Sequence, residues 1–230
     1  NVITFSRDEK KIINLKKKLN LFRTKYFIEK GNILDEDFIH EFSKSTIKKF
    51  KRIDILIHNV GGGGRWGKDN FLKTDINTWD EVYKKNNNGL IIFTKYFLPS
   101  MIKNNWGRVI AIGSVCGIEN TNEDRPWFTA AKSAQHAIIK SFSKKHTFTK
   151  KNITFNSISP GPIFIKNTGW EKIKKKNENA YKNWIKKNIP VNRIGKVEDV
   201  SNLVIYLSSN YSSFINGTNI IVDGGKSNKI

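Results

Sequence analysis

Short apolar runs alternate with longer amphipathic segments along this chain, and this alternation limits the fold more than any other feature. The runs are rich in β-branched and aromatic residues, and they recur about every 15 to 30 residues, as βαβ units require. They lie at residues 2–5, 25–29, 53–57, 108–112, 153–158 and 219–222. The segments between them repeat apolar residues with a helical period. The sequence therefore predicts an α/β fold with a parallel sheet.

The length and the cysteine content indicate one domain without disulfides. A chain of 230 residues can form one α/β domain with a substantial core, so we expect residues 1–230 to form a single domain. Cys116 is the only cysteine, which excludes an internal disulfide. No apolar run reaches the roughly 18 residues that span a bilayer, and no signal peptide opens the sequence. We expect a cytoplasmic protein with no membrane partner.

The formal net charge of +21 would ordinarily indicate a nucleic-acid or anionic-membrane partner. The excess consists mostly of lysine and is spread over every expected helix. Its densest runs, at 16–18 and 174–176, carry no interleaved aromatic residues on which bases could stack. We interpret these runs as solvated helix faces. Nucleic acid is therefore an unexpected partner, and its binding is the third functional hypothesis for this chain.

One strand leads directly into a glycine-rich segment. Residues 53–57 are apolar without interruption, as a parallel strand covered on both faces requires. They are followed by Asn59, Val60 and four glycines at 61–64. Glycine after a strand lets a ligand approach the backbone, although a glycine run alone also fits a flexible loop. His58 is interpreted as structural because no second metal ligand lies nearby, and we expect no metal site.

Residues 107–132 resemble the active-site half of the short-chain dehydrogenase/reductase family. The stretch contains a buried strand, a turn that ends on Ser114, a polar loop and a helix that carries Lys132. The family's pattern is Ser followed by Tyr-x-x-x-Lys, and Phe128 stands in the tyrosine position. Other family landmarks follow in the family's order: Asn59–Gly62, Asn86, Pro160–Gly161 and Asp223–Gly225. The resemblance covers essentially the whole chain.

The resemblance implies a Rossmann-like, doubly wound parallel sheet in three α/β/α layers that binds a nicotinamide dinucleotide. Ser114 would hold the substrate carbonyl, and Lys132 would bind the nicotinamide ribose and lower the pKa of the tyrosine. Asn86 would position a water for the proton relay. Asn86 alternatively reflects a general excess of asparagine in this sequence, and Ser114 and Lys132 are alternatively incidental. Phe128 cannot donate a proton, and loss of a general acid costs about 100- to 10,000-fold in rate.

The resemblance also places cofactor contacts. Ser6 and Arg7 end the strand that reads the adenosine ribose, and an arginine there favours NADP(H) over NAD(H), although Arg7 is alternatively only solvated. Asn32 and Ile33 would contact adenine, and Asn32 is alternatively a polar turn residue. Lys132 would hold the ribose of the nicotinamide. The remaining expected contacts are Asn59, Val60, Gly61, Pro160, Gly161 and Ile163.

Three further expectations follow from the resemblance. The family's first strand and its Gly-rich turn have no counterpart here, which would leave the centre of the sheet empty. Either residues upstream are absent from this sequence or another segment fills the gap. Residues 166–190 would form a substrate lid whose aromatic residues belong to its core or an interface. The C-terminal helix and strand resemble the family's oligomer interface, so we expect a homodimer or homotetramer.

The favoured function is an NAD(P)-dependent oxidoreductase that acts on a carbonyl or secondary alcohol substrate. Because Phe128 replaces the general acid, the proton would have to come from another source. The alternative is a catalytically degenerate family member that binds a dinucleotide or other subunits.

Overall fold

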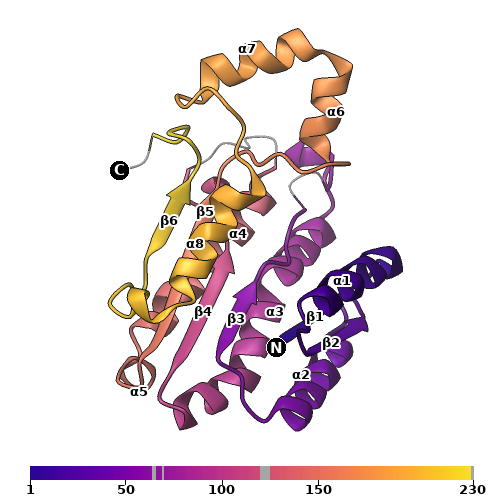
Figure 1. Cartoon of the computed structure of the whole chain (residues 1–230). Helices are drawn as coiled ribbons and strands as arrows, with labels where there is room; N and C mark the ends of the chain where they lie inside the picture. The colour runs from indigo at the N-terminus through magenta and orange to yellow at the C-terminus, as the bar shows by residue number, and fades with distance from the viewer. Residues whose placement is uncertain (64–65, 69, 120–124, 229–230) are drawn as a thin grey trace.

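The computed structural model describes residues 1–63, 66–68, 70–119 and 125–228 (Figure 1). Six strands correspond to the six apolar runs: β1 (Val2–Ser6), β2 (Tyr26–Lys30), β3 (Ile55–His58), β4 (Gly107–Ile112), β5 (Ile153–Pro160) and β6 (Asn219–Val222). The helices are α1 (Glu9–Leu21), α2 (Glu36–Phe50), α3 (Ile76–Lys103), α4 (Pro126–Ser143), α5 (His146–Thr149), α6 (Gly169–Lys176), α7 (Glu178–Asn188) and α8 (Val197–Leu207). Gly64 and the centre of the polar loop, 120–124, lie outside the described residues.

Capping side chains fix where the helices begin. The carboxylate of Asp35 accepts a hydrogen bond from Phe38 N at 3.0 Å, and two acids follow in the first turn of α2. At the last helix, Asp199 accepts from Lys196 N at 2.7 Å, so α8 starts at Val197.

All paired strands are parallel, which confirms the α/β prediction. The strands form a four-stranded sheet in the order β3-β4-β5-β6 and a two-stranded sheet of β1 and β2. Among the described residues no strand pairs with both β1 and β3. No other described segment therefore fills the gap between the two sheets.

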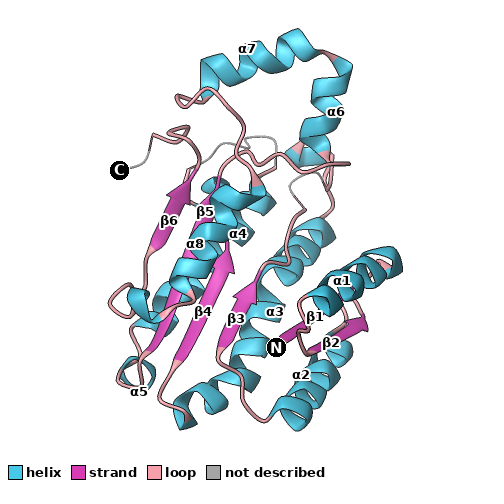
Figure 2. Cartoon of the chain, in the orientation of Figure 1, coloured by secondary structure: helices cyan, strands magenta, loops and turns pink. Residues whose placement is uncertain are grey.

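The helices cover the sheets in two layers, so the fold has the three-layer arrangement that was expected (Figure 2). Helices α2, α3 and α4 lie on one face, and the main apolar core there includes Leu56, Val109, Ala111 and Phe155. Helix α8 covers the opposite face of β4 and β5, where Ile110 and Ile158 pack against Leu207. The alternation of inward and outward residues along β4 accounts for both contacts.

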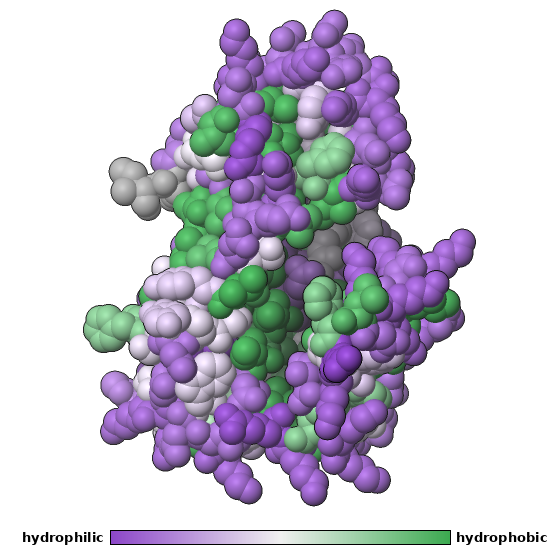
Figure 3. Space-filling model, in the orientation of Figure 1, coloured by the Kyte–Doolittle hydropathy of each residue, from purple (hydrophilic) through white to green (hydrophobic). Residues whose placement is uncertain are grey.

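A groove of about 450 Å³ separates β1 from β3. Figure 3 shows hydrophobic side chains along the floor of a hollow in this region, between the α8 side and the α1 side of the molecule. Ile55 and Ile57 are 40% and 44% exposed, whereas Leu56 and His58 are 8% and 3% exposed. The expectation that both faces of 53–57 are covered is therefore wrong. Helix α3 covers one face, but α1 and α8 lie to either side of the other.

Aromatic rings join the two sheets beneath this groove. The ring centroid of Phe5 on β1 lies 5.4 Å from that of Phe42 on α2 and 6.0 Å from that of Phe93 on α3. Helices α2 and α3 also pack on each other through the same cluster. The two-stranded sheet is thus fixed to the rest of the molecule by helix packing rather than by strand pairing.

Helices α6 and α7 project beyond the carboxyl ends of the strands (Figure 1). They have a small core of their own, made of Tyr181, Ile185, Ile189 and Ile194 with Phe164, Trp170 and Trp184 packed against it. The rings of Trp170 and Trp184 lie 4.8 Å apart. The aromatic residues of this segment are therefore core residues, as the sequence predicted.

Candidate active site

Lys132 occupies a buried position at the carboxyl end of β4. Its side chain lies on α4 and is 4% exposed. The ammonium donates to Ile112 O at 2.9 Å and to Gln135 Oε1 at 3.1 Å. Burial lowers the pKa of Lys132 to about 8, and the charge of Cys116 opposes this shift. Lys132 is therefore a buried cation with an unusually acidic ammonium group.

Asn86 clamps the glycine-rich segment. Its side chain is fully buried, and its Oδ1 accepts from Gly62 N at 3.1 Å while its Nδ2 donates to Gly62 O at 2.8 Å and to Val82 O at 2.7 Å. A Cβ on Gly61 would lie 2.6 Å from Asn86 Oδ1 and 3.1 Å from Lys132 Nζ. Glycine at 61 is thus required because the backbone passes directly over two polar side chains.

Two buried side chains hold the main-chain carbonyl of Asn86. It accepts from Gln135 Nε2 at 2.9 Å and from His58 Nε2 at 3.0 Å. A carbonyl oxygen has two lone pairs, so these two bonds fill it. Burial lowers the pKa of His58 to about 4, which keeps this histidine neutral at neutral pH. The structural interpretation of His58 agrees with these contacts.

Ser114 lies on the same side of the sheet as Lys132. It follows two residues after the Ile112 carbonyl that Lys132 binds, and its Oγ accepts from Cys116 N at 3.2 Å. A Cβ on Gly117 would lie 2.7 Å from the carbonyl carbon of Lys132, so this turn packs directly on α4. His136 Nε2 donates to Ser114 O at 3.4 Å and connects the turn to β5 through Ser157 Oγ at 3.1 Å. The structure thus brings the serine turn and the lysine helix together.

Phe128 lies one helical turn before Lys132 on α4. Its ring packs against a cluster formed by Val82, Trp127 and Ala131, together with Trp66 and Trp79. The rings of Trp79 and Trp127 lie 6.0 Å apart in an edge-to-face arrangement. Phe128 is therefore an aromatic ring in an apolar environment, and it has no proton to donate.

Arg7, directly after β1, is a positive charge close to Lys85, which lies beside the glycine-rich segment. Burial, and after it the charge of Arg7, lower the pKa of Lys85, which shows that the two cations are close enough to repel each other. Lys85 Nζ also lies 3.8 Å from the centroid of the Trp66 ring, and it would lie 3.8 Å from a Cβ on Gly62. Ser6 Oγ accepts from Asp8 N at 3.1 Å and so shapes the turn that presents Arg7.

Two other predicted cofactor residues have structural partners. Asn32 Oδ1 accepts from Leu34 N at 3.2 Å, as a polar turn residue does. Ile33 is 5% exposed, and a Cβ on Gly89 would lie 2.4 Å from its Cδ1, so its side chain belongs to the core. Asn59 and Val60 line the groove between β1 and β3. Because the Ile33 side chain is in the core, only its backbone is available to contact a ligand.

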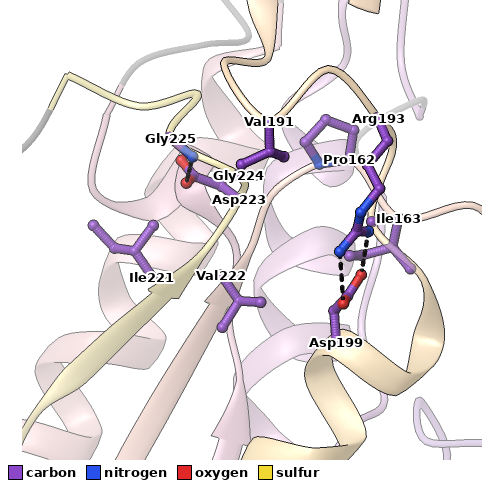
Figure 4. Close-up of a pocket in the computed structure, with 11 residues that line it drawn as sticks. Pro162, Ile163, Val191, Arg193, Asp199, Ile221, Val222, Asp223, Gly224 and Gly225 are labelled. Atoms are coloured by element: carbon purple, nitrogen blue, oxygen red, sulfur yellow. Dashed lines mark hydrogen bonds and ion pairs between the residues drawn. The ribbon is translucent and has the colours of Figure 1, made fainter.

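The Pro160–Gly161 turn approaches the end of β6. A Cβ on Gly161 would lie 2.6 Å from Asp223 Cβ, which explains the glycine. Ile163 pairs with Gly195 in a parallel bridge and lines a separate cavity of about 350 Å³. Figure 4 shows Arg193 and Asp199 facing each other in this cavity, with Arg193 Nη1 2.6 Å from Asp199 Oδ2. This ion pair attaches the base of the α6–α7 segment to α8.

Sequence reasoning missed Gln135 and His136, which both reach the Ser114–Lys132 region. A signal was present, because Ala131, Lys132, Gln135 and Ile139 share the buried face of α4. A glutamine among apolar neighbours on such a face must find hydrogen-bond partners. Asn87 was also missed, although its Nδ2 donates to Ala131 O at 3.0 Å and so holds α3 against α4.

The residues present fit a nicotinamide dinucleotide. Gly61 lets the backbone pass close to Asn86 and Lys132, Lys132 supplies a buried cation, and Arg7 and Lys85 supply positive charge. Within the described ranges, no group of three or more potential metal-ligating side chains occurs. The helices that the structure describes are all too short or too polar to cross a bilayer.

The sequence matches the family model described as enoyl-(acyl carrier protein) reductase over residues 1–227. Two relatives are each named 3-oxoacyl-[acyl-carrier-protein] reductase FabG. The protein from Buchnera aphidicola subsp. Schizaphis graminum is 37% identical over 195 residues, which cover 84% of this chain and 75% of the relative. The protein from Thermotoga maritima is 32% identical over 196 residues, which cover 84% of this chain and 74% of the relative.

Solved structures show the same fold. YwfH, an NADPH-dependent reductase involved in bacilysin biosynthesis, superposes with a TM-score of 0.87 at 24% identity, covering 99% of this chain and 89% of the other. A 7α-hydroxysteroid dehydrogenase complexed with NADH and 7-oxo glycochenodeoxycholic acid superposes with a TM-score of 0.85 at 20% identity. The superposition covers 100% of this chain and 85% of the other. With the family match and the relatives above, the chain belongs to the short-chain dehydrogenase/reductase family of NAD(P)-dependent oxidoreductases.

Proposed function

We propose that this protein is an NADP(H)-preferring oxidoreductase that interconverts a carbonyl and a secondary alcohol at the Ser114–Lys132 site. The observation that carries the proposal is the convergence of Lys132, the Asn86-clamped glycines and the Ser114 turn at one edge of the sheet. The relatives named as 3-oxoacyl reductases support a carbonyl substrate.

The chain's own residues have distinct roles in this proposal. When bound, the dinucleotide supplies or accepts the hydride. Ser114 Oγ orients the substrate carbonyl, and Lys132 binds the nicotinamide ribose. Gly61 and Gly62, held by Asn86, form the floor on which the cofactor lies, and Asn59, Val60, Pro160, Gly161 and Ile163 surround it. The main-chain groups of Asn32 and Ile33 contact the adenine.

The preference for NADP(H) rests on positive charge at the end of β1. Arg7 follows Ser6 there, and its charge contributes to the lowered pKa of Lys85 on α3. Two cations that repel each other are stabilised by an anion between them, and a 2′-phosphate is such an anion. Arg7 is therefore the principal reader of the 2′-phosphate, with Lys85 as a second positive charge.

A mobile lid and an oligomer complete the proposal. Residues 166–190 form a compact segment above the strand ends and would close over the substrate. Large apolar side chains are exposed on α8 and just after it: Ile205 (68%), Tyr206 (43%), Tyr211 (87%) and Phe214 (101%). Exposed apolar side chains in this number suit an interface with a second copy. We place this homodimer or homotetramer in the cytoplasm, because the chain has a single cysteine.

Turnover tests this function directly. NADPH oxidation is measured against a panel of ketones and 3-oxoacyl thioesters, and NADP reduction against secondary alcohols, with wild type and Phe128→Tyr side by side. The proposal expects measurable turnover by the wild type and faster turnover by Phe128→Tyr, with a gain of at most about 100- to 10,000-fold, which is the full contribution of a general acid. NADPH binding without turnover by either protein would instead support the degenerate alternative, which Phe128 favours.

A further inference from the structure

The Phe128 substitution leaves the reaction without its usual source of a proton. A hydride added to a carbonyl carbon leaves negative charge on the oxygen, and that charge must be protonated or otherwise stabilised. The ring of Phe128 is packed among apolar side chains and cannot do this. The next titratable group on the same face of α4, one turn further on, is Lys132.

The ammonium group of Lys132 has one N–H group that is not used by its two acceptors. It carries three N–H groups, and two donate to Ile112 O at 2.9 Å and Gln135 Oε1 at 3.1 Å. Among the described residues no third acceptor is in place. Nζ would lie 3.1 Å from a Cβ on Gly61, so the ammonium group is close to the Gly61–Gly62 segment on which the proposed cofactor lies. Both bound acceptors fix the direction of this group.

Gln135 connects this lysine to α3. It is fully buried, accepts from Lys132 through Oε1 and donates through Nε2 to Asn86 O at 2.9 Å. His58 donates to the same carbonyl, so both lone pairs of Asn86 O are used while Gln135 is in place. An amide does not exchange a proton along this path, so Gln135 holds Lys132 in position and does not relay its proton.

The surroundings also make Lys132 a better acid than an exposed lysine. Burial lowers its pKa to about 8. The titratable groups coupled to it are His58 from β3, Cys116 from the turn after β4 and His136 from α4 itself. Burial lowers the pKa of both histidines, with His58 at about 4. A group with a pKa near 8 is mostly protonated at neutral pH and still releases its proton readily.

We propose that Lys132 donates the proton in this protein and that Gln135 is the positioning residue that aims its ammonium group. The inference rests on the proposed function. The substrate carbon gains a hydride from the reduced nicotinamide, and the carbonyl π bond breaks. The oxygen then forms an O–H bond as one N–H bond of Lys132 breaks, which leaves a neutral amine. The substrate is reduced by two electrons, the dinucleotide is oxidised, and the amine recovers a proton from water.

Substitutions at Lys132 and Gln135 separate donation from binding. Lys132→Arg keeps the positive charge and the hydrogen-bond donors at the nicotinamide ribose, but a guanidinium does not release its proton, so turnover falls by about 100-fold or more while NADPH affinity changes much less. Gln135→Leu releases the ammonium group and lowers kcat by about 10-fold with little change in KM for the ketone. Lys144→Arg, at the exposed end of the same helix, is the matched control and leaves turnover unchanged.

A direct measurement of the Lys132 pKa supplies a readout other than activity. Protein labelled with 13C at the lysine ε carbon is titrated by NMR, and Lys132→Arg identifies the resonance by removing it. The wild-type midpoint is expected near pH 8. Gln135→Leu removes an acceptor for the charged form and lowers the midpoint, whereas Gln135→Glu places a carboxylate beside the ammonium and raises it. Identical midpoints in all three proteins would overturn the role of Gln135.

The Phe128→Tyr variant distinguishes failure of proton donation by Lys132 from failure of the proposed oxidoreductase function. With Phe128→Tyr a phenol supplies the proton, so adding Gln135→Leu costs much less turnover than it does in the wild type. Turnover by Phe128→Tyr but none by the wild type refutes proton donation by Lys132 and leaves the proposed function standing. Full turnover by Lys132→Arg also refutes it. Bound NADPH without turnover in either background overturns the proposed function itself.

Discussion

Replacing Asn86 by alanine tests whether this side chain holds the glycine floor. The substitution removes three hydrogen bonds of 2.7–3.1 Å to the backbone of Gly62 and Val82. Each such bond contributes about 0.5–1.5 kcal/mol net, so the free energy of unfolding should fall by about 3 kcal/mol. For a domain of this size the melting temperature then falls by about 6–12 °C. Because Gly61 and Gly62 lose their support, NADPH binding should weaken as well.

Asn88→Ala is the matched control for this substitution. Asn88 lies on the same helix and makes one exposed hydrogen bond, to Glu36 Oε1 at 2.7 Å. Its loss should change the free energy of unfolding by less than about 0.5 kcal/mol. Chemical denaturation measures both variants, and NADPH fluorescence measures binding. Equal stability of the two variants, or unchanged NADPH affinity in Asn86→Ala, would refute the clamp.

Three further predictions concern the rest of the molecule. Burial lowers the pKa of His58 to about 4, so the unfolded chain binds that proton more tightly and the stability is lost as the pH falls from about 6.5 to about 4. The loss reaches on the order of 3 kcal/mol, and denaturation series should show a flatter pH profile for His58→Gln. Leu56→Ala should lower the free energy of unfolding by about 2–4 kcal/mol, but Ile57→Ala by less than half as much, because only Leu56 is buried; equal costs would mean that the groove is covered. Arg7→Ala should weaken NADPH binding by about 10-fold and leave NADH binding unchanged, and an equal loss for both would reject a 2′-phosphate contact.

The sequence was sufficient to predict the strands and helices because each apolar run has a clear period and polar ends. The sequence left open whether another segment fills the gap before the first apolar run, and among the described residues no strand pairs with both β1 and β3. The prediction that both faces of residues 53–57 are covered was wrong. An apolar pattern shows that the residues suit a covered strand, but it does not show whether a helix packs on each face.

The candidate site was predictable only where a residue type carries its own chemistry. Ser114 and Lys132 stand at strand and helix positions that bring them to one edge of the sheet. The partners of Lys132 depend on tertiary contacts, however, and Gln135 was found only from its bonds to Lys132 and Asn86. Asn32 and Ile33 were expected at the adenine, but local hydrogen bonding and core packing determine the positions of their side chains.

An equilibrium titration with NADPH tests the central claim, that a nicotinamide dinucleotide binds over Gly61 beside Lys132. The wild type should give a saturable change in NADPH fluorescence. Gly61→Ala should abolish that change, because the added Cβ would lie 2.6 Å from Asn86 Oδ1 and 3.1 Å from Lys132 Nζ. A wild-type protein that gives no saturable signal, or a Gly61→Ala variant that binds as tightly as the wild type, would contradict this account.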